Sequence, residues 1–187
     1  MGRLFGTDGA RGIANTEITC ELCTKIGRAT AMVLSENTDS NLKVLIGTDT
    51  RKSADMLSCA LASGLCSSGA DVKMLGVVPT PAVAYLVKKY GYDAGVMVSA
   101  SHNPHEYNGI KIFRSDGYKL PDEVEEEIEA IILDDVRLPP VVTGSQIGSI
   151  AYCDDAVSDY INHVLSTADK PFGSMKLHLT VQTARQV

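Results

Sequence analysis

Residues 42–51 read Leu-Lys-Val-Leu-Ile-Gly-Thr-Asp-Thr-Arg, an apolar run that ends in a polar turn. Consecutive apolar residues without polar alternation are typical of a strand that is covered on both faces. The segment from about Ser53 to Ser68 then has helical spacing, and Gly69 is placed to end that helix. A buried strand followed directly by a helix is the repeating unit of α/β folds, and we take it as the nucleus of this one.

The alternation of strand and helix continues on both sides of this unit. A helix is expected from Thr16 to Ser35, with Thr16 or Thr19 able to cap its start. Short β-branched runs and helical periodicity alternate through the rest of the chain. The expected strands are 71–77, 93–98 and 109–113, and the expected helices are 79–90, 121–133 and 154–166. The pattern therefore predicts an α/β fold with a largely parallel sheet.

The overall charge excludes one class of function. Lys and Arg number 17 and Asp and Glu 23 among 187 residues, which gives a net charge of −6. A sequence-independent nucleic-acid binder needs clustered cations, whereas a small anionic substrate remains compatible with this balance. No apolar run approaches the roughly 20 residues of a membrane helix, and the N-terminus lacks a signal-peptide core. We expect a cytoplasmic chain with neither nucleic acid nor membrane as partner.

Cysteine usage argues against a secreted disulfide framework. The five cysteines are odd in number and are scattered through predicted helices and core, so we expect reduced thiols. Cys20 and Cys23 have the C-x-x-C spacing of a redox or zinc pair, but they lie inside a predicted helix and have no second pair. A redox or zinc module built on Cys20 and Cys23 is a further alternative, which only stoichiometric metal binding would support.

The loop Ser99-Ala100-Ser101-His102-Asn103-Pro104 follows a predicted buried strand. Ligands of open α/β sheets bind outside the carboxyl ends of the strands, where this loop lies. A serine hydroxyl surrounded by backbone donors can carry a phosphoryl group, although an ordinary Asx or Ser turn is the alternative. Lys111 on the returning strand could approach the same opening, or it could simply be exposed to solvent.

The segment Phe5-Gly6-Thr7-Asp8-Gly9-Ala10-Arg11-Gly12 is the second candidate for chemistry. Three glycines, an acid and an arginine make a flexible turn that presents a guanidinium, and arginine suits phosphate or carboxylate recognition. The alternative is a glycine-rich turn in which Asp8 simply pairs with Arg11.

The predicted helix 121–133 carries six acidic residues. We interpret it as a solvated outer face, with the acids favourably placed near the helix N-terminus.

The chemistry-bearing segments together resemble the α-D-phosphohexomutase family. The segments that carry the resemblance are Phe5–Gly12, Ser99–Pro104 with Asn108–Lys111, Gly47–Arg51 and Pro79–Pro81. The resemblance implies a three-layer α/β/α domain with a mostly parallel mixed sheet over residues 1–149. Residues 150–187 would then be the incomplete start of a second, similar domain.

The resemblance also implies an activity, namely transfer of phosphate between the C6 and C1 positions of a hexose phosphate through a bisphosphorylated sugar. It is nearest to members that convert glucosamine 6-phosphate to glucosamine 1-phosphate for cell-wall precursors. The implied partners are a hexosamine phosphate substrate and a sugar bisphosphate activator. Ser101 would carry the phosphoryl group, Arg11 and Lys111 would supply acid/base or phosphate-neutralising groups, and His102 would shape the loop. Mg²⁺ is the implied cofactor, with the phosphate on Ser101 as one of its ligands.

Two rival functions stay open at this point. One is phosphomannomutase or phosphoglucomutase activity, because the family's sugar-selecting loop has no match in this sequence. The other is a catalytically inert fragment that at most binds phosphate or associates with itself, because the family's metal-binding and phosphate-binding loops also have no match here.

The C-terminal tail departs from the family pattern. After Met175-Lys176 we expect a strand that ends in a sequence like Leu-Asp-Cys-Ala-Asn-Gly, whereas residues 179–184 read Leu-Thr-Val-Gln-Thr-Ala. With suitable synonymous codons, a shift of one nucleotide converts the first sequence into the second. We therefore expect the tail after about His178 to arise from a frameshift, and the chain to be a truncated product.

Overall fold

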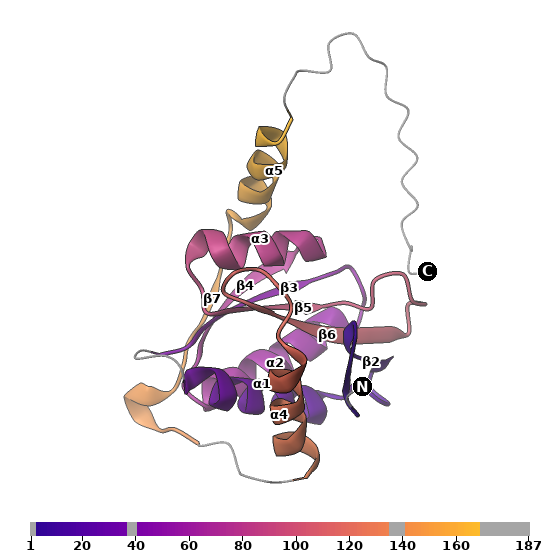
Figure 1. Cartoon of the computed structure of the whole chain (residues 1–187), viewed down its shortest axis with the longest axis vertical. Coiled ribbons are helices and arrows are strands. Elements are labelled where there is room, and N and C mark those ends of the chain that lie inside the picture. The colour runs from indigo at the N-terminus through magenta and orange to yellow at the C-terminus, as the bar shows by residue number, and fades with distance from the viewer. Residues whose placement is uncertain (1–2, 37–40, 135–140, 169–187) are drawn as a thin grey trace.

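The computed structural model describes residues 3–36, 41–134 and 141–168, and it places them around one seven-stranded sheet (Figure 1). The expectations for the strand near Met175 and for the tail after His178 lie outside the described residues.

The elements follow one another in the order that the sequence predicts, with additions at both ends. The strands are β1 (Phe5–Gly6), β2 (Gly9–Ile13), β3 (Lys43–Thr48), β4 (Asp71–Val77), β5 (Ala94–Val98), β6 (Tyr107–Arg114) and β7 (Ile150–Tyr152). The helices are α1 (Cys20–Ser35), α2 (Ala54–Ser67), α3 (Thr80–Tyr90), α4 (Asp122–Leu133) and α5 (Ala156–Ser166), with a short 3₁₀ turn at Gly144–Gln146. The side chain of Thr19 caps α1 by accepting a hydrogen bond from the backbone N–H of Leu22, at 3.2 Å.

The sheet is mixed, and the expected α/β fold is confirmed. Its strand order is β1-β2-β6-β5-β3-β4-β7. The pairings β5–β3, β3–β4 and β4–β7 are parallel, whereas β1–β2, β2–β6 and β6–β5 are antiparallel. The parallel half comes from the strand–helix repeats of the sequence. In the antiparallel half, β1–β2 and β5–β6 are short returns that need no crossover helix, whereas β2–β6 joins distant parts of the chain.

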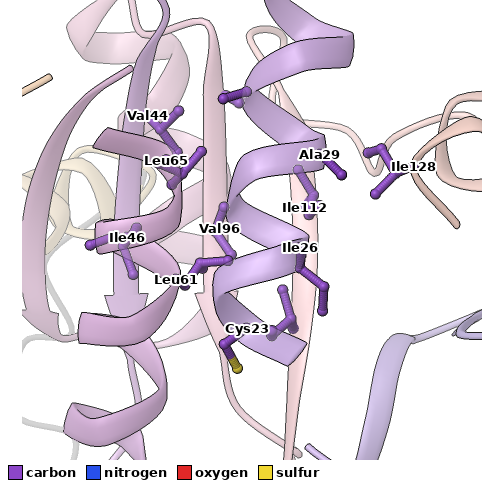
Figure 2. Close-up of a cluster of buried hydrophobic side chains, with 14 of the residues drawn as sticks. Cys23, Ile26, Ala29, Val44, Ile46, Leu61, Leu65, Val96, Ile112 and Ile128 are labelled. Atoms are coloured by element: carbon purple, nitrogen blue, oxygen red, sulfur yellow. The ribbon is translucent and has the colours of Figure 1, made fainter. Parts of the chain in front are cut away.

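Helices cover both faces of the sheet, which makes three layers. In Figure 1, α3 lies on one side of the sheet and α1, α2 and α4 lie on the other. Successive residues of β3 divide between the layers: Val44 and Ile46 join the core under α1 and α2, and Leu45 joins the core under α3. Figure 2 shows the larger core, where Ile26, Leu61 and other apolar side chains meet the strands. The two-sided burial explains why the strand near Leu45 has no polar alternation.

Helices α1 and α2 pack closely because glycines face the contact. A Cβ added to Gly27 would lie 2.4 Å from the carbonyl oxygen of Leu61, and one added to Gly64 would lie 2.3 Å from that of Thr24. Both distances are well inside van der Waals contact, so larger side chains would push the helices apart.

The N-terminal segment is more ordered than the glycine-rich turn that the sequence suggests. Residues 5–6 and 9–13 form the hairpin β1–β2, and β2 pairs antiparallel with β6 along Ala10–Ile13. The partner of β2 lies about 100 residues further along the chain, so local sequence patterns could not indicate this strand.

Our interpretation of α4 as a uniformly solvated acidic face is wrong for two of its acids. Glu125 and Glu129 are each only 3% exposed. The carboxylate of Glu129 accepts hydrogen bonds from the backbone N–H groups of Phe5 at 2.5 Å, Leu4 at 2.7 Å and Arg3 at 2.9 Å. Glu125 accepts one from the ammonium of Lys119 at 2.5 Å. Glu129 therefore anchors the start of the chain, and Glu125 joins α4 to Lys119.

The sheet extends past residue 149, where we expect the first domain to end. β7 pairs with β4, and Ser149 is tied to Asp71 by a backbone and a side-chain hydrogen bond of 2.8 and 2.7 Å. α5 then packs near α3, where Asp159 accepts a hydrogen bond from Tyr90 at 2.6 Å. A domain boundary at residue 149 stays a prediction. β7 and α5, which follow that residue, contact β4 and α3 of the preceding part of the chain. None of the helices in the described ranges combines the length and apolar character that crossing a bilayer would take.

Glu129→Gln tests the buried carboxylate. Burial opposes its charge, but the three backbone donors prevail and lower the pKa of Glu129. We expect the free energy of unfolding to fall by about 1–3 kcal/mol at neutral pH, measured by urea denaturation, because one backbone donor loses its acceptor. A group with a lowered folded pKa stabilises above its ordinary pKa and loses that effect as pH falls through the lowered value. The gap between parent and variant should therefore narrow in acid.

Glu123→Gln is the matched control, because Glu123 is an exposed acid of the same helix. Equal losses in the two variants would contradict an anchoring role for Glu129.

Candidate functional site

The candidate site centres on the loop that connects β5 to β6. All five residues of β5 are buried, and the loop leaves its carboxyl end at Ser99. The side chains of Ser101 and His102 are exposed, whereas Ser99 and Ala100 are buried. The loop therefore has a fixed base and presents the Ser101 hydroxyl to solvent.

Ser101 has an unusual backbone conformation. Its φ is 57°, in the left-handed region, which costs a residue other than glycine roughly 1–2 kcal/mol. Its N–H donates to the hydroxyl oxygen of Ser99 at 3.0 Å, and the N–H of Asn103 donates to the carbonyl of Ala100 at 3.1 Å. The turn alternative foreseen from the sequence is thus present, but in a strained form that the surroundings must hold.

Arg51 provides much of that support, and our sequence reasoning assigned it no role. It lies in the turn after β3, and its side chain is only 6% exposed. Its terminal nitrogens donate to four backbone carbonyls of the loop. The acceptors are the carbonyl oxygens of Pro104 at 2.6 Å, Asn103 at 2.8 Å, Tyr107 at 2.9 Å and Ser101 at 3.0 Å. One signal in the sequence could have pointed to Arg51. It follows β3, a parallel neighbour of β5, so the turn after β3 and the loop after β5 lie at the same edge of the sheet.

Asp49 connects Arg51 to the base of the loop. One of its carboxylate oxygens accepts from the backbone N–H of Arg51 at 3.0 Å. The other accepts from Nε of Arg51 at 3.0 Å and from the hydroxyl of Ser99 at 2.7 Å. Ser99 in turn accepts from the N–H of Ser101, so a continuous polar network runs from β3 to Ser101.

The pairing of β2 with β6 brings Arg11 and Lys111 together. Arg11 lies opposite Gly109, and Lys111 is two residues further along β6, so both side chains lie on the same face of the sheet. A Cβ on Gly109 would lie 2.6 Å from the carbonyl oxygen of Ala10 and 2.9 Å from Cγ of Arg11. Glycine at this position therefore lets the two strands approach.

Asp8 lies between the two cations. Its carboxylate is 3.1 Å from the ammonium of Lys111 and 3.4 Å from the guanidinium of Arg11. Lys111, then Arg11 and to a smaller extent His102, lower the pKa of Asp8. The expected Asp8–Arg11 pair exists, but it is part of a larger cluster that also includes the lysine. We name Asp8, Arg11 and Lys111 the charged cluster.

The cysteines give no support to a redox or zinc module. Cys23 is fully buried, and burial together with Cys20 raises the pKa of its thiol to about 12. A buried thiol with a raised pKa is a poor redox nucleophile, and within the described ranges no three His, Cys, Asp or Glu side chains are grouped to hold a metal ion.

The arrangement is suited to holding an anion beside a hydroxyl. Arg11 and Lys111 are partly exposed, at 20% and 23% of their side chains, and their described ion-pair partner is the half-exposed carboxylate of Asp8. A phosphate on Ser101 would compete with that carboxylate for the same two cations.

The chain is similar in sequence to enzymes of clostridia. It is 52% identical to the phosphoglucosamine mutase of Clostridium novyi (strain NT) over 179 residues, which are 96% of this chain and 40% of that protein. It is 53% identical to the phosphoglucosamine mutase of Ruminiclostridium cellulolyticum over 177 residues, 95% of this chain and 39% of that protein. The chain thus spans about two fifths of the length of these curated relatives.

Family and structural comparisons agree with the sequence relatives. The family model described as phosphoglucomutase/phosphomannomutase, alpha/beta/alpha domain I, matches residues 2–137. A putative phosphomannomutase from Thermus thermophilus superimposes with a TM-score of 0.74 at 30% identity, over 90% of this chain and 37% of that chain. A phosphoglucomutase/phosphomannomutase family protein from Burkholderia thailandensis superimposes with a TM-score of 0.71 at 26% identity, over 88% of this chain and 35% of that chain.

The ion pairs of the charged cluster make a prediction for NMR titration. We expect the carboxyl group of Asp8 to titrate below the usual range of aspartates, and Lys111→Met to raise its pKa back toward that range. The sign follows because the lysine favours the charged carboxylate, so the pair is intact above the lowered pKa of Asp8 and is lost as pH falls through it.

Lys25→Met removes an exposed lysine of α1 and serves as the control for this titration. An Asp8 midpoint that moves equally in both variants would show that net charge, rather than the contact with Lys111, controls it.

Proposed function

Because this chain belongs to the phosphoglucomutase/phosphomannomutase family, we propose that its Ser101 loop is the phosphoryl carrier of a phosphoglucosamine mutase. The reaction interconverts glucosamine 6-phosphate and glucosamine 1-phosphate through a phosphoserine and a bisphosphorylated sugar. The observation that carries the proposal is an exposed serine in a constrained loop whose base is joined to the strands of Arg11 and Lys111. The N–H of Ser99 donates to the carbonyl of Gly109, which lies opposite Arg11 and two residues before Lys111. The choice of glucosamine phosphates is supported by the names of the relatives from Clostridium novyi and Ruminiclostridium cellulolyticum.

The loading step begins with a sugar bisphosphate. The Ser101 hydroxyl oxygen attacks one phosphorus atom, a new P–O bond forms to Ser101, and the bond from phosphorus to the sugar oxygen breaks. Lys111 gives a proton to the departing sugar oxygen and recovers one from the serine hydroxyl, so atoms and charge balance. In turnover, the phosphoserine gives its phosphoryl group to the free C1 hydroxyl of glucosamine 6-phosphate, which forms the bisphosphate. Transfer of the C6 phosphate back to Ser101 by the loading step then releases glucosamine 1-phosphate.

Arg11 takes a different part from Lys111 in this proposal. A guanidinium keeps its proton in proteins, so Arg11 neutralises charge on the transferred group and does not exchange protons. Phosphoryl transfer depends mainly on positioning and on charge stabilisation, and a cation fixed by the pairing of β2 with β6 supplies both. His102, whose side chain is exposed beside Ser101, shapes the rim of the loop.

Mg²⁺ enters the proposal through the phosphate. A phosphate on Ser101 would offer the hard oxygen ligands that this ion prefers. In the described part of the chain, no group of three or more His, Cys, Asp or Glu side chains is arranged to hold a metal ion. The nearby carboxylates of Asp8 and Asp49 are engaged by cations of the chain itself. These residues do not make a Mg²⁺ site by themselves, and no step above passes through the ion.

Phosphate uptake by the purified chain tests the carrier role. We expect incubation with glucose 1,6-bisphosphate and Mg²⁺ to add one phosphate, seen by intact-mass analysis, and Ser101→Ala to abolish the addition because the accepting oxygen is gone. Ser158→Ala, which removes a surface hydroxyl of α5, should behave like the parent. Phosphate that persists in Ser101→Ala would refute the assigned role.

The same experiment separates the rival sugars. Phosphorylated chain is mixed with glucosamine, glucose or mannose 6-phosphate, and the loss of phosphate from the protein is followed over time. Fastest loss to glucosamine 6-phosphate supports the proposal, whereas fastest loss to either other sugar favours phosphoglucomutase or phosphomannomutase. Uptake without transfer to any sugar favours the inert fragment.

A further inference from the structure

Arg51 has every hydrogen-bond donor of its side chain in use. A guanidinium carries five N–H groups in a fixed planar fork. Nε donates to Asp49, and each terminal nitrogen donates to two loop carbonyls, which makes five acceptors for five donors. The group is also almost completely buried, so it has neither a free donor nor an open face for a ligand.

The same network holds Ser101 from both of its peptide groups. The carbonyl of Ser101 accepts from Arg51 directly. Its N–H donates to Ser99, whose hydroxyl donates to Asp49, which in turn pairs with Arg51. The two peptide planes that flank Ser101 define its φ and ψ, so the network fixes the left-handed conformation in which the hydroxyl is presented.

Arg11 and Lys111 contrast with Arg51 in this respect. They are partly exposed, and an exposed carboxylate that a phosphate could replace is their ion-pair partner in the described part of the chain. An arginine close to a phosphate carrier would ordinarily be interpreted as a phosphate ligand. All five donors of Arg51 are instead taken by Asp49 and by backbone carbonyls of the loop, which leaves none for a phosphate.

We propose that Arg51 is a positioning residue that sets the conformation of Ser101 through the loop backbone and does not bind phosphate. The part of this inference that concerns phosphoryl transfer rests on the proposed function, whereas the part that concerns loop conformation does not. Lysine cannot replace Arg51, because an ammonium has three donors at one point and cannot span four carbonyls and a carboxylate.

The test compares Arg51→Lys with Arg114→Lys in the 187-residue chain. Arg114 forms an exposed ion pair with Asp116, so its replacement controls for the loss of a guanidinium. The first readout is hydrogen–deuterium exchange of amides 99–108. The second is phosphate uptake at Ser101 against the concentration of glucose 1,6-bisphosphate, which separates the maximal rate from the half-saturating concentration.

We expect Arg51→Lys to speed exchange in the loop by about tenfold or more, as several hydrogen bonds are lost there, and to leave α1 and β3 unchanged. The maximal rate of phosphate uptake should fall about tenfold or more while the half-saturating concentration stays within about twofold, as a positioning role requires. Parental exchange in the loop would overturn the inference. So would a change confined to the half-saturating concentration, which would mark a phosphate ligand.

Ser99→Ala keeps the inference testable if Arg51→Lys does not fold. It deletes one hydroxyl from the network and retains Arg51, so we expect a smaller rise in exchange that is centred on Ser101. Exchange at Ser101 equal to that of the parent would again overturn the inference. If the parent chain takes up no phosphate, the proposed function fails, but loop exchange still decides the role of Arg51.

Discussion

The site depends on one constraint, namely that β6 pairs with a strand on each of its sides. Antiparallel pairing with β5 closes the loop that carries Ser101 and returns Lys111 toward it. Antiparallel pairing with β2 brings in Arg11 from the start of the chain. If either pairing slipped by one residue, the side chains of that strand would change faces, and the cations would leave the loop. The register of β6 therefore determines whether a charged cluster exists at all.

The sequence predicts the central layers well and the periphery poorly, for physical reasons. Helices α1 to α4 carry the periodicity of an apolar face, and β3 and β5 are continuous apolar runs because helices cover both faces of the sheet. The hairpin β1–β2 has no such signal, since its order comes from β6 and from Glu129. Residue types indicated Ser101, Arg11 and Lys111 as candidates, because a hydroxyl just after a buried strand and cations near the same opening suit phosphate chemistry. The role of Arg51 could not be predicted, because it depends on carbonyl groups, which every residue has.

Helix α4 holds the start of the chain through a buried acid, which its strongly acidic composition does not indicate. Helix α4 covers the sheet with its apolar residues, while Glu129 accepts three backbone donors at the start of β1. The hairpin that carries Asp8 and Arg11 is thus attached to the helical layer at one end and to β6 at the other. Glu125 has the opposite balance, because burial raises its pKa more than Lys119 lowers it. Neighbouring carboxylates on one helix turn can therefore have pKa values shifted in opposite directions, according to whether backbone donors reach them.

Because Arg51 binds carbonyl oxygens, it restricts some sequence changes in this loop and not others. A guanidinium that contacts the main chain is indifferent to the side chains attached to it, so positions 103, 104 and 107 are free to vary as far as Arg51 is concerned. Loop length is not free, because the four carbonyls must reach one planar group at 2.6 to 3.0 Å. As far as Arg51 is concerned, side-chain changes at positions 103, 104 and 107 should therefore be tolerated better than insertions or deletions between Ser101 and Tyr107.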